Sequence, residues 1–295
     1  VQTCALPILC DRLRLLFFGN LAQDWSEFVL AELGIFRYEA VPISRESRGF
    51  RSRRDVDDYL HLRRCREQFE AGQAVAEVLA ELGDFSSANP HLSRRHAKLL
   101  FHLGQAEERT GELAQAAALY AASSHAEARQ RRVRVLEKLG DLQRAHDLAT
   151  AALLAPRNDA EAQALERALP RLQRQLGLPR QPRPAAAEAG LIELELPRPE
   201  ASSVEWAVQQ HLHDEQAPVF YVENTLVCGL FGLLCWEAIF APLPGAFFHP
   251  FHSGPADLYR DDFHARRQHL FEDCLARLDR EEHGERIRQR YHEKF

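Results

Sequence analysis

The sequence predicts a mainly α-helical protein, with an N-terminal helical domain followed by a solenoid of helix hairpins. Three observations carry this prediction: apolar residues at helical spacing near the N-terminus, a turn motif that occurs three times, and a long apolar run in the last third. The chain has 295 residues, of which 45% are hydrophobic and 27% charged. This composition excludes disordered, collagen-like and disulfide-stapled chains, and the length indicates about two domains.

Two other protein classes are also excluded by the sequence. The apolar run 226–236 is too short for a membrane span, which needs about 20 apolar residues. The six cysteines are scattered without a CxxC pair, so neither a zinc ribbon nor a disulfide framework is expected. A protein without membrane association, in a reducing cytoplasm, is therefore expected.

Residues 1–8 are set aside before the fold is considered. The chain contains no methionine, and Val1–Ile8 resembles a translated sequencing adapter. The chain is accordingly expected to be a fragment.

Residues 9–75 predict a helical domain of winged-helix type. Leu13, Leu16 and Phe17 recur at helical spacing, and the capping-box pattern 24–27 predicts the start of a second helix that ends at Gly34. Residues 35–41 alternate between apolar and polar side chains, which predicts a short strand before a proline.

An arginine run follows within this domain. Its members are Arg45, Arg48, Arg51, Arg53 and Arg54. Phosphate is the natural partner of such a run in an acidic chain. The alternative is a solvated loop whose charge is partly neutralised by Asp55, Asp57 and Asp58, and the residues leave both interpretations open.

Residues 76–178 predict stacked helix hairpins. The pattern G-[DE]-[FL]-x-x-A begins at Gly83, Gly111 and Gly140, with spacings of 28 and 29 residues. A glycine that ends one helix, an acid that starts the next and a small alanine describe the turn of such a hairpin. The units are similar in architecture to tetratricopeptide repeats, whose usual length is about 34 residues.

The second hairpin leads into Arg129, Arg131, Arg132 and Arg134, which lie along one side of a helix. The spacing fits a nucleic-acid face, and it fits an ordinary solvated face better. Residues 179–203 are proline-rich and predict a linker with one isolated strand over 191–196.

The segment 204–295 contains the residues with the clearest chemical signal. The apolar stretch 226–240 predicts a helix that is buried nearly all round. Glu223 precedes it, and a carboxylate at a helix N-terminus suits a hard cation such as Mg²⁺. The alternative is an ordinary first-turn residue. A metal site of His249, His252, His264 and Asp257 is the less favoured interpretation, because His-x-x-His in a proline-containing loop lacks the helical spacing of a zinc site. Packed and solvated imidazoles are expected instead.

Several blocks of this sequence closely resemble the Fanconi-associated nuclease family, the VRR-NUC group of structure-specific endonucleases. The resemblance covers residues 9–295. The blocks are Glu223–Leu226, Leu230–Phe247, Pro255–Tyr259, Arg14–Leu21, Trp25–Phe28 and Phe36–Glu39.

The resemblance implies a bacterial metal-dependent phosphodiesterase that cuts DNA near 5′ flaps in repair, including interstrand crosslink repair. It makes 204–295 the helical opening of a restriction-endonuclease-like α/β nuclease domain and Glu223 a catalytic residue and ligand of Mg²⁺ or Mn²⁺. The family's Pro-Asp and Glu-x-Lys core is missing, so the fragment is expected to be inactive alone.

The resemblance also implies partners and a location. It adds Arg37 to the arginine run as a DNA-binding residue, with branched 5′-flap DNA as the partner. It allows a homodimer on DNA, and it implies a bacterial cytoplasmic location at the nucleoid. The alternative is a non-enzymatic helical scaffold that binds a protein partner or DNA.

Overall fold

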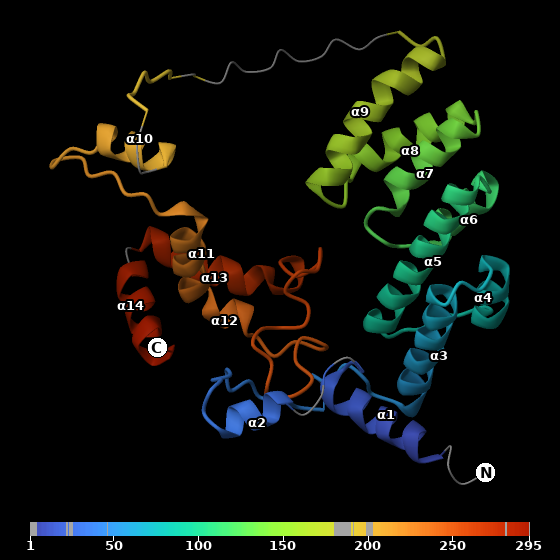
Figure 1. Cartoon of the computed structure of the whole chain (residues 1–295), viewed down its shortest axis with the longest axis horizontal. Helices are drawn as coiled ribbons and strands as arrows, with labels where there is room; N and C mark the ends of the chain where they lie inside the picture. Colours follow the sequence, from blue (N-terminus) through green and yellow to red (C-terminus); the bar gives the residue numbers. More distant parts are fainter. Residues whose placement is uncertain are drawn as a thin grey trace. The chain divides into compact units, whose positions relative to one another are not determined.

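The computed structural model describes residues 5–21, 23, 26–45, 47–179, 190, 192–198, 203–280 and 282–294. The regular structure within these residues is helical, as predicted (Figure 1). The chain divides into two compact units. Unit 1 contains Val1–Gln181 and Phe240–Arg266, and unit 2 contains Pro182–Ile239 and Arg267–Phe295.

Unit 1 begins with α1 (Ala5–Phe18) and α2 (Ser26–Glu32). Gly34 follows α2 with a φ of 68°, as expected for a glycine after a helix end. The strand predicted over 35–41 is wrong, because these residues are irregular. A strand is stabilised by hydrogen bonds to a second strand, and the described residues supply none. The predicted cap at 24 and 25 lies outside the described residues.

Helix α3 (Arg53–Glu70) begins at a reciprocal cap. The Asp55 backbone N–H donates to Ser52 Oγ at 3.1 Å, and the Ser52 N–H donates to Asp55 Oδ2 at 3.2 Å. Helices α1, α3, α4 (Val75–Leu82) and α5 (Pro90–Thr110) share one core. Each buried aliphatic side chain there contributes about 1.5–3 kcal/mol. Core members include Leu15, Val56, Leu62, Cys65, Val78, Leu92, Leu99 and Leu103.

The hairpin solenoid continues from α5 through four more helices, which follow one another in Figure 1. They are α6 (Leu113–Ala122), α7 (Ala128–Lys138), α8 (Leu142–Leu154) and α9 (Asp159–Gln175). The predicted turn is confirmed twice. Gly111 and Gly140 have φ values of 94° and 79°, and Glu112 and Asp141 are the N-caps of α6 and α8.

The first copy of the motif departs from this pattern. Gly83 ends α4, but a loop follows and α5 begins only after Asn89. Asn89 Oδ1 accepts the backbone N–H of His91 at 3.0 Å, and Pro90 occupies the first helical position. An asparagine N-cap followed by proline at the first helical position strongly favours the start of a helix. The helix therefore begins there and not at Asp84.

Residues 240–266 pack within unit 1. Phe247 and His249 are buried, and the Phe248 ring lies against the backbone of Gly49. A Cβ atom at position 49 would lie 2.0 Å from Phe248 Cε1, so only glycine fits there. The Gly245 N–H donates to the Ser47 carbonyl at 3.1 Å. These contacts hold the arginine-rich loop in place.

One prediction for the following segment is corrected by the structure. Residues 192–196 are irregular, so the isolated strand predicted over 191–196 is wrong in its described part, again because no partner strand is described. Residues 180–189, 191 and 199–202 of the predicted linker lie outside the described residues.

Unit 2 is a separate helical body. Its helices are α10 (Val204–Leu212), α11 (Glu223–Leu234), α12 (Trp236–Ile239), α13 (Gln268–Asp279) and α14 (His283–Lys294). Glu237 joins three of them, because its carboxylate accepts hydrogen bonds from Arg277 at 3.0 Å, from Arg290 at 2.7 Å and from Arg286.

The helix predicted over 226–240 differs from the structure in two ways. It is divided at Cys235 into α11 and α12, and its apolar side chains are not buried all round. Leu226 is 48% exposed and Val227 62%, whereas Leu234 and Ala238 are buried. The exposed side of α11 is an apolar surface of the kind that marks a contact with further protein.

None of the helices in the described ranges is both long enough and apolar enough to span a bilayer.

A basic cavity at two helix N-termini

A cavity of about 640 Å³ lies within unit 1 where the arginine-rich loop meets the start of α5. The segment 244–266 completes its wall. The lining residues are Arg48, Gly49, Arg51, Ser52, Asp55, Ala88, Asn89, Pro90, His91, Arg94, Pro244, Gly245, Asp262 and Arg266.

Two helices begin at this cavity. Ser52 caps α3 and Asn89 caps α5, and both caps belong to the wall. The side chain of Asn89 also donates from Nδ2 to the Gly49 carbonyl at 2.8 Å, which ties the loop to α5. The free N–H groups of a helix N-terminus carry partial positive charge, so both helices favour an anion here.

Four arginine side chains add full positive charge to the wall. Arg94 Nη1 pairs with Asp262 Oδ2 at 3.0 Å, and Arg266 pairs with Asp257. Arg48 is exposed and forms no ion pair with any described residue. The carboxylate of Asp55 already accepts two backbone N–H groups, from Arg51 and Ser52. Positive charge therefore exceeds negative charge around the cavity.

Two guanidinium nitrogens near the cavity are buried without a hydrogen-bond partner among the described residues. They are Nε of Arg94 and Nη1 of Arg260. Burial and the neighbouring positive charge of Arg94 together lower the pKa of Arg260 to about 10. Buried N–H groups are normally satisfied, so donors left over at an electropositive wall indicate a site for an anion. The guanidinium fork suits the oxygens of a phosphate.

His91 does not contribute charge to this wall. Burial and, to a smaller extent, the positive charges of Arg95, Arg260 and Arg94 together lower its pKa to about 3. Its Nδ1 lies 3.4 Å from Nη2 of Arg260 and accepts from it. The imidazole is therefore neutral near pH 7.

The neutral His91 predicts a pH dependence of stability. The unfolded chain protonates this imidazole near pH 6.5, whereas the folded chain resists until about pH 3, so stability falls as the pH drops through this window. At pH 5 the loss is about 2 kcal/mol relative to pH 7. Urea unfolding at both pH values measures the free energy of unfolding. Between pH 7 and pH 5, His91→Gln should lose less of it than the unaltered chain does, by about that amount. An equal loss in the two proteins would contradict the prediction.

The cavity contains part of the predicted DNA-binding set. Arg48 and Arg51 line it. Arg53 and Arg54 begin α3 and pair with Asp57 at 3.6 Å and Asp58 at 3.8 Å, as the neutralised-loop interpretation expects.

Arg37 and Arg45 are exposed and lie outside the cavity wall. The sequence analysis missed Arg94, Arg260 and Arg266. Arg94 and Arg266 each belong to an arginine pair, and the Arg94 pair also follows the Asn89–Pro90 helix start closely.

The structure locates Glu223 only by its backbone. It is the first residue of α11, and its side chain lies outside the described residues. In the described part of the chain, no three His, Cys, Asp or Glu side chains are grouped to hold a metal ion. A divalent metal site is therefore not assembled from these residues alone.

The histidines weighed as a metal site pack against aromatic rings. The His249 ring stacks on Phe17 with centroids 5.4 Å apart, and its Nδ1 accepts the Phe251 N–H at 3.1 Å. Burial lowers the pKa of His249 to about 4. This favours the packed-imidazole interpretation.

Together, the fold and the cavity define a helical-repeat protein with a basic surface cavity. Comparison with known proteins specifies the family. The chain is 56% identical over 288 residues to a Fanconi-associated nuclease 1 homolog of Pseudomonas aeruginosa, covering 97% of this chain and 52% of that relative. It is 34% identical over 68 residues to the Schizosaccharomyces pombe homolog, covering 23% of this chain and 10% of that relative. No family model matches.

Solved structures agree with the sequence comparison. Crystal structures of paFAN1 bound to 5′-flap DNA with a gap match with TM-scores of 0.83 for the two-nucleotide flap and 0.81 for the one-nucleotide flap. Identity is 56% and 55%, covering 97% and 99% of this chain and 53% and 54% of those chains. The chain belongs to the Fanconi-associated nuclease family, and it spans about half the length of the bacterial relative it matches.

Proposed function

We propose that this chain supplies DNA-binding surface to a structure-specific nuclease that acts on 5′ flaps. The observation that carries the proposal is the basic cavity, where two helix N-termini, Arg48 and Arg94 with its unsatisfied Nε surround one volume. Arg260, which donates to the cavity residue His91, adds a second buried donor nearby. Phosphates of the DNA backbone would satisfy these donors and balance the charge. The likeness to paFAN1, which was crystallised with 5′-flap DNA, supports flap DNA as the substrate.

The catalytic part of the proposal rests on Glu223. In this proposal Glu223 is one carboxylate ligand of Mg²⁺ or Mn²⁺. A bound divalent ion stabilises the charge that develops on the attacking and leaving oxygens in phosphodiester hydrolysis. Because one carboxylate cannot hold such a site, the isolated chain would bind DNA without cutting it.

The wider role follows from the family. We place the intact protein in DNA repair, including interstrand crosslink repair, in the bacterial cytoplasm at the nucleoid. A homodimer on the DNA remains an expectation of the same proposal.

The test is a salt series of DNA binding by the purified 295-residue chain, read by fluorescence anisotropy. We expect tighter binding to a 5′ flap than to an unbranched duplex of equal length. We also expect the logarithm of affinity to fall linearly with the logarithm of salt, by about 0.9 per phosphate contact. Absence of binding at low salt would overturn the proposal in favour of a scaffold that binds protein.

Cleavage is measured in the same samples after Mg²⁺ or Mn²⁺ is added. We expect the flap to remain intact. Metal-dependent cleavage by the chain that is lost in Glu223→Ala would overturn the proposed inactivity and would support the assignment of Glu223.

A further inference from the structure

A second basic surface runs along the helical repeats, apart from the cavity at the helix N-termini. Three hollows of about 290, 560 and 320 Å³ lie between α3 and α5, between α5 and α7, and between α7 and α9. All three belong to unit 1. We call the residues that line these hollows the repeat groove.

The hollows of the repeat groove are neighbours along the helices. His102 lines the first hollow and Gln105 the second, and His102 Nδ1 lies 3.2 Å from Gln105 Oε1 one turn further along α5. Arg131 and Arg134 line both the second and the third hollow. On α5, the lining residues 95, 98, 102, 105 and 109 are three or four positions apart, so they share one helix face.

The groove is strongly basic although the whole chain has a net charge of −6. Eight lysine and arginine residues line it, against three glutamates. Two of these glutamates are already engaged: Glu70 accepts Nε of Arg66 at 2.7 Å, and Glu108 accepts Nζ of Lys138 at 2.8 Å. The side chain of Glu108 is only 7% exposed, so its charge is turned inward.

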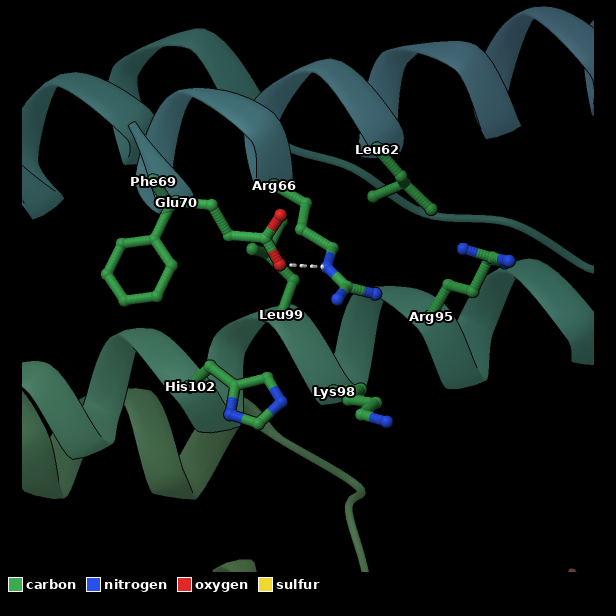
Figure 2. A pocket seen from close by; sticks show the side chains of 8 residues that line it. All are labelled: Leu62, Arg66, Phe69, Glu70, Arg95, Lys98, Leu99 and His102. Carbon is green, nitrogen blue, oxygen red and sulfur yellow. Dashed lines mark hydrogen bonds and ion pairs between the residues drawn. The ribbon is translucent and has the colours of Figure 1, made fainter. Parts of the chain in front are cut away.

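Two exposed cations of the groove are not neutralised. Lys98 and Arg109 form no ion pair with any carboxylate in the described part of the chain. Figure 2 shows that the charged ends of Arg66, Arg95 and Lys98 gather at one end of the first hollow. The ring of Phe69 lies at the other end. The hollow thus offers both a cationic end and an apolar end.

The floor of the groove is apolar. Leu62 and Leu99 are buried beneath the cations of the first hollow, and Val133, Leu165 and Ala168 line the third. A ligand that matches this pattern carries carboxylates and apolar side chains in turn. Nucleic acid matches it less well, because single strands bind by base stacking on aromatic rings and Phe69 is the one phenyl or indole side chain lining the three hollows.

We propose that the repeat groove docks an acidic peptide segment of a partner protein, in which apolar side chains separate the carboxylates. The cations steer and orient the segment, and the apolar floor contributes the burial. Stacked helical repeats present extended surfaces suited to such a ligand. This proposal is independent of flap binding, which uses the other basic surface.

The probe is a short fluorescein-labelled peptide in which glutamate and leucine alternate, titrated with the full chain at low salt. The same peptide with glutamine in place of glutamate is the control ligand. We expect saturable binding of the acidic peptide that weakens with salt, and at least about tenfold weaker binding of the glutamine peptide.

The key variant is Lys98→Glu/Arg109→Glu, which reverses two exposed charges that have no carboxylate partner. We expect it to bind the acidic peptide at least about tenfold more weakly. Arg144→Glu is the matched control, because Arg144 is exposed on α8 outside the groove, and its peptide affinity should not change. Thermal unfolding checks that both variants fold. If Lys98→Glu/Arg109→Glu does not fold, the charge-neutralising variant Lys98→Gln/Arg109→Gln is used in its place.

Binding of flap DNA by the double variant distinguishes a peptide groove from a nucleic-acid groove. If the double variant keeps its affinity for flap DNA while losing the peptide, the proposal is supported. Peptide binding that is equal in the double variant and the unaltered chain would overturn it. Loss of flap binding in the double variant, without any peptide binding by the unaltered chain, would overturn it in favour of a nucleic-acid groove.

Discussion

Arg48→Glu is expected to weaken the binding of 5′-flap DNA by about tenfold to a hundredfold. Arg48 lies on the wall of the basic cavity, is exposed and has no ion-pair partner among the described residues. The change removes the proposed charge-assisted hydrogen bond from Arg48 to a DNA phosphate, which contributes about 1.5–3 kcal/mol. The new carboxylate also repels the phosphate. Fluorescence anisotropy at fixed salt measures the affinity.

Two further variants make this result specific to the cavity. Arg94→Gln should also weaken binding, because Arg94 lines the same wall and carries a buried Nε without a partner. For each lost phosphate contact the salt slope should fall by about 1. Arg144→Glu on α8 controls for a general change of charge. Unchanged affinity in Arg48→Glu would show that the cavity is not the DNA site.

Glu161→Gln is expected to destabilise the repeats by about 3 kcal/mol. The carboxylate is 1% exposed and accepts Nε and Nη2 of Arg129 at 2.8 and 2.6 Å and the Arg157 N–H at 2.7 Å. In Glu161→Gln the guanidinium of Arg129 loses the negative charge that balances it. Loss of one charge of a buried pair costs several kcal/mol of stability. Urea unfolding monitored by circular dichroism measures the loss.

The same carboxylate predicts a dependence on acid. Burial alone would raise the pKa of Glu161, but the hydrogen bonds from Arg129 and Arg157 outweigh burial and lower it. The stabilisation is therefore complete above the unfolded pKa near 4.5 and is lost as the pH falls through the lower folded value. In Glu161→Gln the free energy of unfolding should therefore depend less on pH in this acidic range. Arg129→Ala/Glu161→Gln should cost less than the sum of the single changes, and additive losses would contradict the coupling.

Local chemistry made the solenoid predictable. Gly111 and Gly140 supply the positive φ that ends a helix, Asp141 supplies a cap, and Ala116 and Ala145 are fully buried at the packed turns. All of these signals lie within a few residues of one another. Gly83 carries the same pattern, yet the stronger Asn89–Pro90 signal placed the next helix start further along the chain.

The incorrect predictions concern features that depend on distant partners. Residues 35–41 alternate like a strand, but alternation produces a strand only where a second strand accepts its hydrogen bonds. The stretch 226–240 is apolar enough for a buried helix, but burial depends on which elements cover it. Leu226 and Val227 remain exposed because no described element covers that side of α11.

The residues of the basic cavity also differ in whether the sequence alone could identify them. Arg48 and Arg51 could be predicted to share a basic surface because they belong to one contiguous basic run. Arg266 could not, because it is far from the run in sequence and joins the wall only through the packing of 240–266 within unit 1. The role of Glu223 stays a prediction.

The sequence alone was sufficient for the helical class, the hairpin turns and the family, because each rests on short-range patterns or on contiguous residues. Tertiary structure decided which arginines are neutralised by neighbouring carboxylates, which share a cavity and which apolar side chains stay exposed. These properties depend on contacts between residues far apart in the chain, and charge pairing and burial are set by those contacts rather than by local spacing.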